Sequence, residues 1–188
     1  GLIGLGRMSY ELEKYISAEK YFSQLLKIAS IIEHKKSAIL GILESKFHLY
    51  KYDDVITDIS TMVEEGLFSG KENVRIHYLK AFSLYKTNKI NESLIEFTWL
   101  IENTEGELRA EAFYYVSLLL NNVQKYKSSQ DMIFQLINEM PNYQIWIEKS
   151  FLILAKNYIQ QEDMFQAQHV LLELEKKCQN EDILYEIR

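Results

Sequence analysis

Apolar side chains recur along this chain in one spacing that returns five times. Each series starts with an aromatic or apolar residue, continues with a small or modest residue three positions later, and then has apolar residues after four and three more positions. Such steps keep side chains on one face of an α-helix, so each series predicts an amphipathic helix. The series are Tyr15-Ala18-Phe22-Leu25, Tyr52-Val55-Ile59-Met62, Ile90-Ser93-Phe97-Leu100, Tyr126-Ser129-Ile133-Leu136 and Met164-Ala167-Leu171-Leu174.

The starts of these series lie 36 to 38 residues apart, which indicates an internal repeat of paired helices. The helix before each series has its own apolar stripe and, in four units, a small residue that lets the partner helix approach closely. These small residues are Gly6, Ala81, Ser117 and Ala155. In the second unit Leu43 occupies the expected place and Gly41 lies higher up the helix. One pair cannot bury its apolar face alone, so we expect the units to stack.

The composition supports an all-α chain. Only 7 glycines and 1 proline occur among 188 residues, and 47% of the residues are apolar, which favours packed helices over a loop-rich or all-β fold. We expect helices at roughly 2–13, 15–30, 33–50, 52–65, 72–87, 90–103, 106–123, 126–139, 143–161 and 164–178, and an eleventh near 181. The expected repeats are 1–31, 32–68, 69–105, 106–141 and 142–179, followed by the start of a further helix at 180–188.

The fifth unit resembles the tetratricopeptide repeat (TPR) family. Its matching residues are Phe151, Leu154-Ala155, Tyr158, Ala167 and Leu171. The first unit matches through Leu5-Gly6, Ala18 and Phe22, with Ser9 where the family has tyrosine, and the middle units keep mainly the apolar stripes. The resemblance implies an all-α fold, an α-solenoid of about five TPR-like helix-turn-helix repeats with 10 to 11 helices in a right-handed superhelix. We expect residues 1–188 to form a single such domain.

A longer stretch of the fifth unit resembles long multi-repeat TPR proteins of Bacteroidetes. It runs from Trp146 through Phe151 and Tyr158 to Phe165-Gln166-Ala167. This resemblance implies a scaffold role and a periplasmic or envelope-associated location, and the alternative without it is the cytoplasm. The chain starts without methionine and its last residues resemble the opening of another helix, so we expect a fragment of a longer protein.

The sequence contains no constellation that predicts catalysis, a cofactor or a metal site. The four histidines form no metal-ligand spacing, and Cys178, the only cysteine, has no histidine pattern beside it. No phosphate-binding glycine loop and no nucleophile elbow occur. We therefore predict that the protein is not an enzyme and binds no cofactor.

Charge and hydropathy narrow the classes of partner. The net charge of −6 disfavours contact with phosphate backbones, so we expect no nucleic-acid binding. No apolar run approaches the 18 residues of a membrane-spanning helix, so we expect no membrane insertion by this segment. The expected partner is another protein or a peptide.

The TPR resemblance also implies which side chains face a partner, because first helices line the concave groove in that family. The candidate residues in that register are Phe47, Arg75, Tyr78, Phe82, Tyr85, Tyr114, Asn121, Lys149 and Lys156. The same register also places Leu40, Glu44, Glu111, Leu118, Leu152 and Ile159 in the groove. Tyr78, Phe82 and Tyr85 share one helix face by their spacing alone. Aromatic side chains with charges around them suit an extended peptide or an apolar helix. The alternative is that these aromatic residues fill the inside of a tight superhelix as core.

Two functions follow from this reading. The first is a non-catalytic protein–protein interaction scaffold whose concave groove binds a peptide or helix of a partner. The second is a ligand-binding or sensory TPR region of a larger envelope or regulatory protein, which a closed pocket of a few hundred Å³ would favour. Binding of chaperone C-termini is not expected, since Glu44 and Leu118 stand where the carboxylate clamp of that TPR class needs hydrogen-bond donors.

Overall fold

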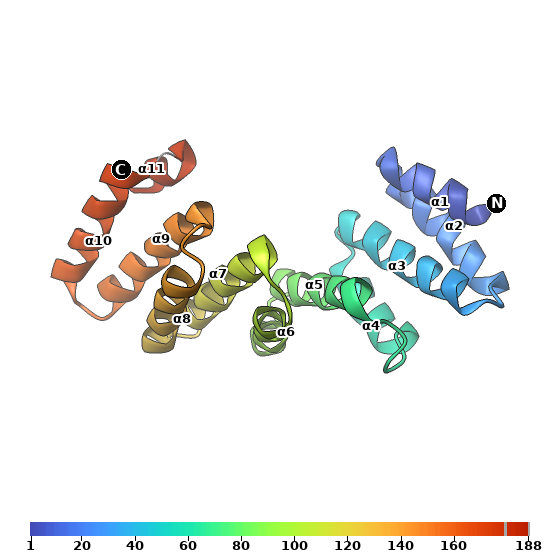
Figure 1. Ribbon diagram of the computed structural model, residues 1–188, viewed down its shortest axis with the longest axis horizontal. Helices are drawn as coiled ribbons and strands as arrows, with labels where there is room; N and C mark the ends of the chain where they lie inside the picture. Colours follow the sequence, from blue (N-terminus) through green and yellow to red (C-terminus); the bar gives the residue numbers. More distant parts are fainter. Residues whose placement is uncertain (179, 188) are drawn as a thin grey trace. The chain divides into compact units, whose positions relative to one another are not determined.

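A computed structural model describes residues 1–178 and 180–187. Gln179, the last residue of the fifth expected repeat, and Arg188 lie outside the described residues. The described residues form eleven helices (Figure 1). These are α1 (Leu2–Glu11), α2 (Tyr15–Ile28), α3 (Ile32–His48), α4 (Tyr52–Met62), α5 (Gly70–Lys86), α6 (Ile90–Asn103), α7 (Gly106–Asn122), α8 (Tyr126–Glu139), α9 (Gln144–Gln160), α10 (Met164–Lys177) and α11 (Glu181–Ile187).

The predicted all-α fold is confirmed, and the apolar series locate the helix starts closely. Each even-numbered helix from α2 to α10 begins at the first residue of one series. The largest difference is at the end of α4, which stops at Met62 instead of near residue 65. The loop that follows contains Gly66 at a positive φ of 75° and inserts Phe68 into the core, where its side chain is buried.

The turn inside each pair has the same backbone geometry in all five pairs. One residue per turn has a left-handed conformation, with φ between 58° and 61°. In the first turn Glu13 N–H donates to the Tyr10 carbonyl and Lys14 N–H donates to the Ser9 carbonyl, which together form a Schellman motif. The left-handed residues are Glu13, Tyr50, Asn88, Gln124 and Glu162, and their spacing equals the sequence repeat.

The two helices of a pair cross at one residue of each helix, and these two residues are twelve positions apart in the sequence. The small residues predicted at the crossing are buried. In α6 Ser93 Oγ donates to the Ala81 carbonyl at 3.0 Å, and in α8 Ser129 Oγ donates to the Ser117 carbonyl at 2.8 Å. These contacts tie the second helix of a pair directly to the backbone of the first. Ala155 and Ala167 form the equivalent crossing between α9 and α10, and both are buried.

The Phe22 ring packs so closely on Gly6 and Gly41 that neither position has room for a side chain. A Cβ atom at Gly6 would lie 2.8 Å from the ring, and a Cβ at Gly41 would lie 2.4 Å from it. The ring is therefore held against backbone of α1 on one side and of α3 on the other. This explains the irregular second unit, in which glycine precedes the usual small position.

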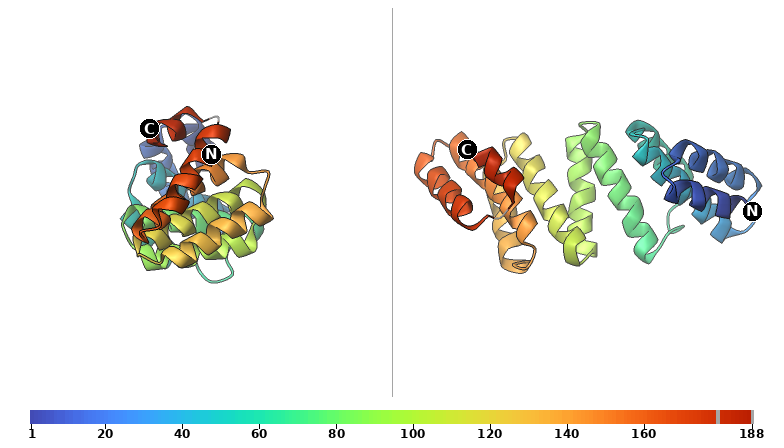
Figure 2. Two further views of the ribbon diagram at one scale, coloured as in Figure 1. Left: turned by 90° about the vertical axis from the view of Figure 1, so that its left-hand side faces the viewer. Right: turned by 90° about the horizontal axis from the view of Figure 1, so that it is seen from above.

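The described chain divides into two compact units, an N-terminal unit from Gly1 to Glu96 and a C-terminal unit from Phe97 onward. Within each unit consecutive helices lie side by side, as Figures 1 and 2 show for α1 and α2 and for α9 and α10. The N-terminal core joins α3, α4 and α5 through Leu43, Val55 and Leu79. In the C-terminal unit Ile133 of α8 packs with Ile153 and Leu154 of α9.

Helices α10 and α11 each begin with a side-chain N-cap. Asp163 accepts a hydrogen bond from the Gln166 N–H at 3.1 Å, and Asn180 accepts one from the Ile183 N–H at 3.2 Å. Asn142, whose residue type is common at N-caps, does not cap α9, because the chain makes a turn there and α9 starts later, with Tyr143 as its N-cap residue and no side-chain cap.

Candidate functional site

The predicted partner-facing residues of the N-terminal unit lie on α3 and α5, and their burial differs. Phe82 is only 7% exposed, whereas Tyr78 and Tyr85 are partly exposed. The Tyr78 and Phe82 rings lie 4.6 Å apart between centroids, and the Arg75 guanidinium lies 5.3 Å from the Tyr78 ring centroid. Phe82 therefore has the burial of a core residue, while the two tyrosines keep surface for a partner.

Phe47, on the neighbouring α3, is partly buried against the N-terminal core and contacts the Tyr52 ring at a centroid distance of 5.5 Å. The part of this side chain that packs on the core stabilises the fold. Phe47 lies in the last turn of α3.

A recess of about 230 Å³ opens on this side of the N-terminal unit, where the first helices of three consecutive pairs contribute side chains. We call this surface the first-helix recess. Its apolar lining comes from Phe22 and Leu40, and its polar lining from Tyr10 and from charged groups of both signs. The lining residues are Arg7, Tyr10, Glu11, Phe22, Ser37, Leu40, Gly41, Glu44 and Glu72.

Polar contacts between the helices fix the shape of the first-helix recess. Arg75 Nε donates to Glu44 Oε1 at 2.8 Å, which joins α5 to α3. Burial raises the pKa of the Tyr10 hydroxyl, as does the charge of Glu44, while Arg75 opposes the rise through its charge and a hydrogen bond. Tyr10, Glu44 and Arg75 therefore form one polar group contributed by α1, α3 and α5.

In the C-terminal unit the predicted residues Tyr114 and Lys149 meet around Trp146. The Tyr114 and Trp146 ring centroids are 5.6 Å apart, and Lys149 Nζ lies 4.6 Å from the Trp146 ring. Burial raises the pKa of the nearby Glu111 carboxyl, as does Glu107, and the Lys149 charge partly offsets the rise. The arrangement is an aromatic surface with one cation and one partly buried carboxyl.

The remaining predicted residues of the C-terminal unit have different environments. Asn121 donates its side-chain amide to Asn157 Oδ1 at 2.8 Å, so it links α7 to α9. Leu152 is not available to a partner, because it packs in a core cluster with Leu174, Cys178 and Ile183 of α11. Lys156 is exposed. The position of Leu152 within its own helix does not predict that α11 buries it.

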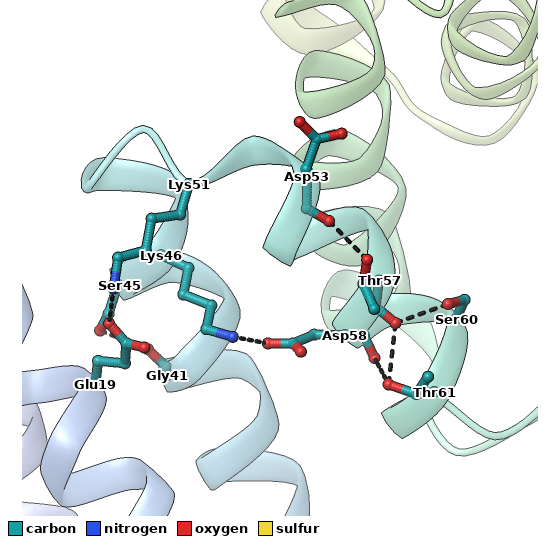
Figure 3. Close-up of polar contacts among 10 residues, drawn as sticks. All are labelled: Glu19, Gly41, Ser45, Lys46, Lys51, Asp53, Thr57, Asp58, Ser60 and Thr61. Atoms are coloured by element: carbon teal, nitrogen blue, oxygen red, sulfur yellow. Dashed lines mark hydrogen bonds and ion pairs between the residues drawn. The ribbon is translucent and has the colours of Figure 1, made fainter. Parts of the chain in front are cut away.

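Ion pairs connect neighbouring helices beside the candidate surface of the N-terminal unit (Figure 3). Lys46 Nζ of α3 lies 2.6 Å from Asp58 Oδ2 of α4, and Lys51 Nζ lies 2.9 Å from Glu19 Oε2 of α2. Figure 3 shows the Lys46 side chain extended toward Asp58 across the helix pair. These groups hold helices together and are already paired.

Two of the four histidines, and the cysteine, contact neighbouring side chains in ways that serve the fold. His48 stacks on Tyr15 at a centroid distance of 4.6 Å, and His77 Nδ1 lies 2.6 Å from Glu96 Oε2. Burial raises the pKa of the Cys178 thiol, which donates to Glu148 Oε2 at 3.2 Å. Among the described residues no group of three or more metal-ligating side chains comes together, and no helix is long and apolar enough to cross a membrane.

Comparison with solved structures identifies the architecture. YrrB, described as a TPR protein with an unusual peptide-binding site, superposes with a TM-score of 0.77 over 98% of this chain and 89% of its own, at 13% identity. The fold is that of TPR proteins. MamA gives a TM-score of 0.75 over 94% of this chain and 91% of its own, also at 13% identity.

A further TPR-like structure, a putative kinesin light chain of Podosopora anserina, gives a TM-score of 0.73 at 9% identity and covers 95% of this chain and 96% of its own. No family model and no curated protein sequence matches the chain. The TPR fold predicted from the repeat pattern is thus confirmed by structures whose sequences have diverged widely from this one.

The sequence register of the TPR fold found the helices of the recess but missed several of its residues. Arg7, Tyr10 and Glu72 line it, and none of the three was among the residues that the register placed in the groove, whereas Leu40 and Glu44 were. A signal was available: Arg7 and Tyr10 lie one repeat before Glu44 and Phe47 in the same register. Extending the register to the first unit would have included both.

Proposed function

We propose that this chain is a non-catalytic protein-interaction module that binds a peptide or a helix of a partner on its first-helix surfaces. The first-helix recess carries this proposal, because it joins an apolar lining to charges of both signs on three helices. Such a combination suits recognition of a short apolar anchor with polar neighbours. The peptide-binding site in the description of YrrB supports the same use of the fold.

In this proposal Leu40 forms the apolar wall that takes the anchor side chain, and Tyr78 and Tyr85 extend the surface along α5. Arg7 and Glu11 are exposed at the rim and form no ion pair within the described residues, so they are open to charges of a partner. Lys149, Lys156, Tyr114 and Trp146 make the corresponding surface of the C-terminal unit.

Selection of peptides by phage display on the intact chain tests the proposal, with affinities of the selected peptides measured by fluorescence anisotropy. Leu40→Glu places a charge in the recess and is expected to weaken binding by about tenfold or more, since each factor of ten is about 1.4 kcal/mol. The matched control is Ile95→Glu, which puts the same charge on an exposed residue of α6. Equal affinities of Leu40→Glu and the wild type would place binding elsewhere.

Two variants distinguish aromatic residues that bind a partner from aromatic residues that stabilise the fold. Tyr85→Ala is expected to weaken peptide binding with little loss of stability, because Tyr85 is partly exposed. Phe82→Ala is expected to lower the free energy of unfolding by about 3 kcal/mol, since Phe82 is buried. If Tyr85→Ala binds as the wild type does, the tyrosine belongs to the fold and not to the binding surface.

A second candidate is a small-ligand site, and a recess of about 340 Å³ between α9 and α10 favours it. Glu148 lines this recess with only 5% exposure, accepts hydrogen bonds from Gln144 and Cys178, and has no ion pair within the described residues. Lys177, which also lines the recess, is paired with Glu173 at 3.1 Å. The Glu148 carboxylate therefore suits an amine, and Phe151 offers an apolar wall. Titration with butylammonium, followed by NMR of the wild type and of Glu148→Gln, tests this; shifts unchanged in Glu148→Gln would exclude the site.

A further inference from the structure

Helix α4 is shorter than the other second helices. It has 11 residues, whereas α2, α6, α8 and α10 each have 14. In α2 and α8 the last turn contains Leu26 and Ile137, which pack against the cores of their units. The chain leaves α4 before this turn, after Met62, and residues 63–69 form the connection to α5. The repeat is therefore broken at the end of α4, and departures from a repeated pattern are where functional sites are expected.

A pocket of about 580 Å³ lies beside the shortened end of α4. We call it the α4–α5 pocket, because α4, the connection 63–69 and α5 all contribute to its wall. Its volume is in the range of small-molecule sites. None of its lining residues also lines the first-helix recess or the recess around Glu148, so it is a separate site within the N-terminal unit.

The apolar lining of the α4–α5 pocket belongs to the core of the N-terminal unit. Ile59, Phe68 and Ile76 are buried in that core, and Val63 packs against it. Phe68 reaches this place because the connection folds back after Gly66, whose φ is positive. The apolar wall is thus held in place by packing and is present without a ligand.

Charged groups around the α4–α5 pocket indicate what it binds. Glu64 and Glu65 line it, are exposed, and form no ion pair within the described residues. Lys80 also lines it, but Lys80 Nζ lies 2.6 Å from Glu96 Oε1, and His77 Nδ1 lies 2.6 Å from the second oxygen of that carboxylate. The uncompensated charges are therefore those of two carboxylates, which favour a cation next to the apolar wall.

We propose that the α4–α5 pocket binds a small organic cation with an apolar body, of the class of the arylalkyl ammonium ions. The apolar body contacts Val63 and Phe68, and the ammonium group lies at the carboxylates of Glu64 and Glu65. The ion keeps its charge in water at the open side of the pocket, so no charge has to be buried. This binding does not require the peptide surface of the first helices.

Three probes of similar shape and different charge test the proposal by NMR titration of the isotope-labelled chain. They are phenethylammonium, the neutral phenethyl alcohol and the anion phenylacetate. Phenethylammonium is expected to shift amide signals within residues 59–80 and to bind about tenfold more tightly than the alcohol, a ratio that equals about 1.4 kcal/mol. Phenylacetate is expected to bind more weakly than the alcohol. The differences are expected to shrink at high salt, because both carboxylates are exposed.

Variants separate the charge of the site from its shape. Glu64→Gln with Glu65→Gln is expected to abolish the preference for phenethylammonium over the alcohol. Glu102→Gln with Glu105→Gln is the matched control, because Glu102 corresponds to Glu64 in the repeat, both control residues are exposed, and α6 keeps its last turn. It is expected to leave every affinity unchanged. Ser60→Trp fills the pocket from an exposed position and is expected to weaken binding of all three probes.

Circular dichroism verifies the helix content of each variant. Equal affinities of the wild type for phenethylammonium and phenethyl alcohol overturn the proposal, as does the absence of shifts within residues 59–80. Shifts confined to residues 144–177 assign the ammonium ion to the recess around Glu148 and overturn it as well. Because the peptide experiments measure a different surface through Leu40, either proposal can fail without the other.

Discussion

The two units connect neighbouring helices through a different balance of polar contacts, although the C-terminal unit also has one interhelix ion pair, Arg109–Glu139, among its described residues. In the N-terminal unit the connections are mainly ion pairs, namely Lys36–Glu72, Lys46–Asp58, Lys51–Glu19, Arg75–Glu44 and Lys80–Glu96. In the C-terminal unit a neutral chain joins three helices: Asn121 donates to Asn157, Asn157 donates to Ser129, and Ser129 donates to the Ser117 carbonyl. Both units have the same apolar stripes and the same positions at which paired helices cross. Apolar packing therefore determines the fold, and the polar contacts between helices can differ from one unit to the other.

One position of the repeat shows the difference most directly. It holds Ser45 and Ser83 in the N-terminal unit, and Leu119 and Asn157 in the C-terminal unit, and all four side chains are fully buried. Ser45 Oγ donates to the Gly41 carbonyl of its own helix, and Ser83 Oγ has no hydrogen-bond partner among the described residues. Only Asn157 combines the reach to both neighbouring helices with an amide that can donate and accept hydrogen bonds, so one residue makes the neutral connection between α7, α8 and α9 possible.

The largest effect is expected from Asn157→Ala. The substitution removes hydrogen bonds of 2.8 Å to Asn121 and to Ser129 and leaves a cavity at a fully buried position. We expect the free energy of unfolding of the C-terminal unit to fall by about 3 kcal/mol. Urea unfolding followed by tryptophan fluorescence measures this, because Trp99 and Trp146 both lie in that unit.

Ser83→Ala is the matched control at the same repeat position. Its hydroxyl is buried without a partner, so its removal is expected to leave stability unchanged or slightly higher. Urea unfolding followed by circular dichroism measures the change. Equal losses from Asn157→Ala and Ser83→Ala would show that the amide network adds nothing beyond packing at this position.

An effect of intermediate size is expected from Lys46→Met in the N-terminal unit. The change leaves Asp58, only 8% exposed, without the ammonium that now lies 2.6 Å away. Because both side chains keep some contact with water, we expect a loss of about 2 kcal/mol, below the cost of breaking a fully buried pair. Urea unfolding followed by circular dichroism measures it.

The double variant Lys46→Met with Asp58→Leu distinguishes the contribution of the ion pair to stability from the contribution of apolar packing. Since an apolar pair of similar size often replaces an ion pair without loss, most of the stability is expected to return. Lys127→Met in the C-terminal unit is the exposed counterpart, because the Lys127–Asp131 pair is largely in water, and no measurable change is expected. A double variant as unstable as Lys46→Met would mean that the lysine stem, and not its charge, stabilises the unit.

Most of the helices were predictable because the spacing of apolar residues along the sequence defines the repeat. Tyr15, Tyr52 and Met164 start both an apolar series and a helix, and the small residues Gly6 and Ser117 are buried where close approach was expected. These features depend on neighbours three or four residues away, or on a partner helix one turn later in the chain. Periodicity in one sequence contains that information.

The surroundings of individual site residues were less predictable, because they depend on helices a full repeat away. Arg75 bonds to Glu44 across 31 residues, and Asn121 bonds to Asn157 across 36. Nothing in the local pattern around Asn121 distinguishes an amide that meets a partner protein from one that meets a neighbouring helix. Leu152 was assigned to the surface for the same reason, and the α11 contact with Ile183 buries it.

The smallest expected effect is a difference between the units in how their free energy of unfolding changes as the pH falls. One carboxyl in each unit determines this difference. Burial acts to raise the pKa of Glu96, but hydrogen bonds and charges of His77 and Lys80 outweigh it, so the pKa lies below its usual range. The stabilising contribution of Glu96 is therefore present above the pKa of an unfolded-state carboxyl and is lost as pH falls through the lower folded pKa. Burial and Glu107 raise the pKa of Glu111, so its charge disfavours the folded C-terminal unit at neutral pH, and that penalty disappears on acidification.

Urea unfolding at neutral pH and near pH 4, a value close to the ordinary carboxyl pKa, measures the difference. Tryptophan fluorescence reports the C-terminal unit, and hydrogen exchange of α5, corrected for the intrinsic pH dependence of exchange, reports the N-terminal unit. Glu96→Gln is expected to reduce the acid loss of the N-terminal unit, and Glu111→Gln to raise the stability of the C-terminal unit at neutral pH while removing its relative gain in acid. Identical acid responses of Glu96→Gln and the wild type would contradict a role for the His77–Glu96–Lys80 group, and the contrast between charged and neutral connections would then rest on Lys46 and Asp58.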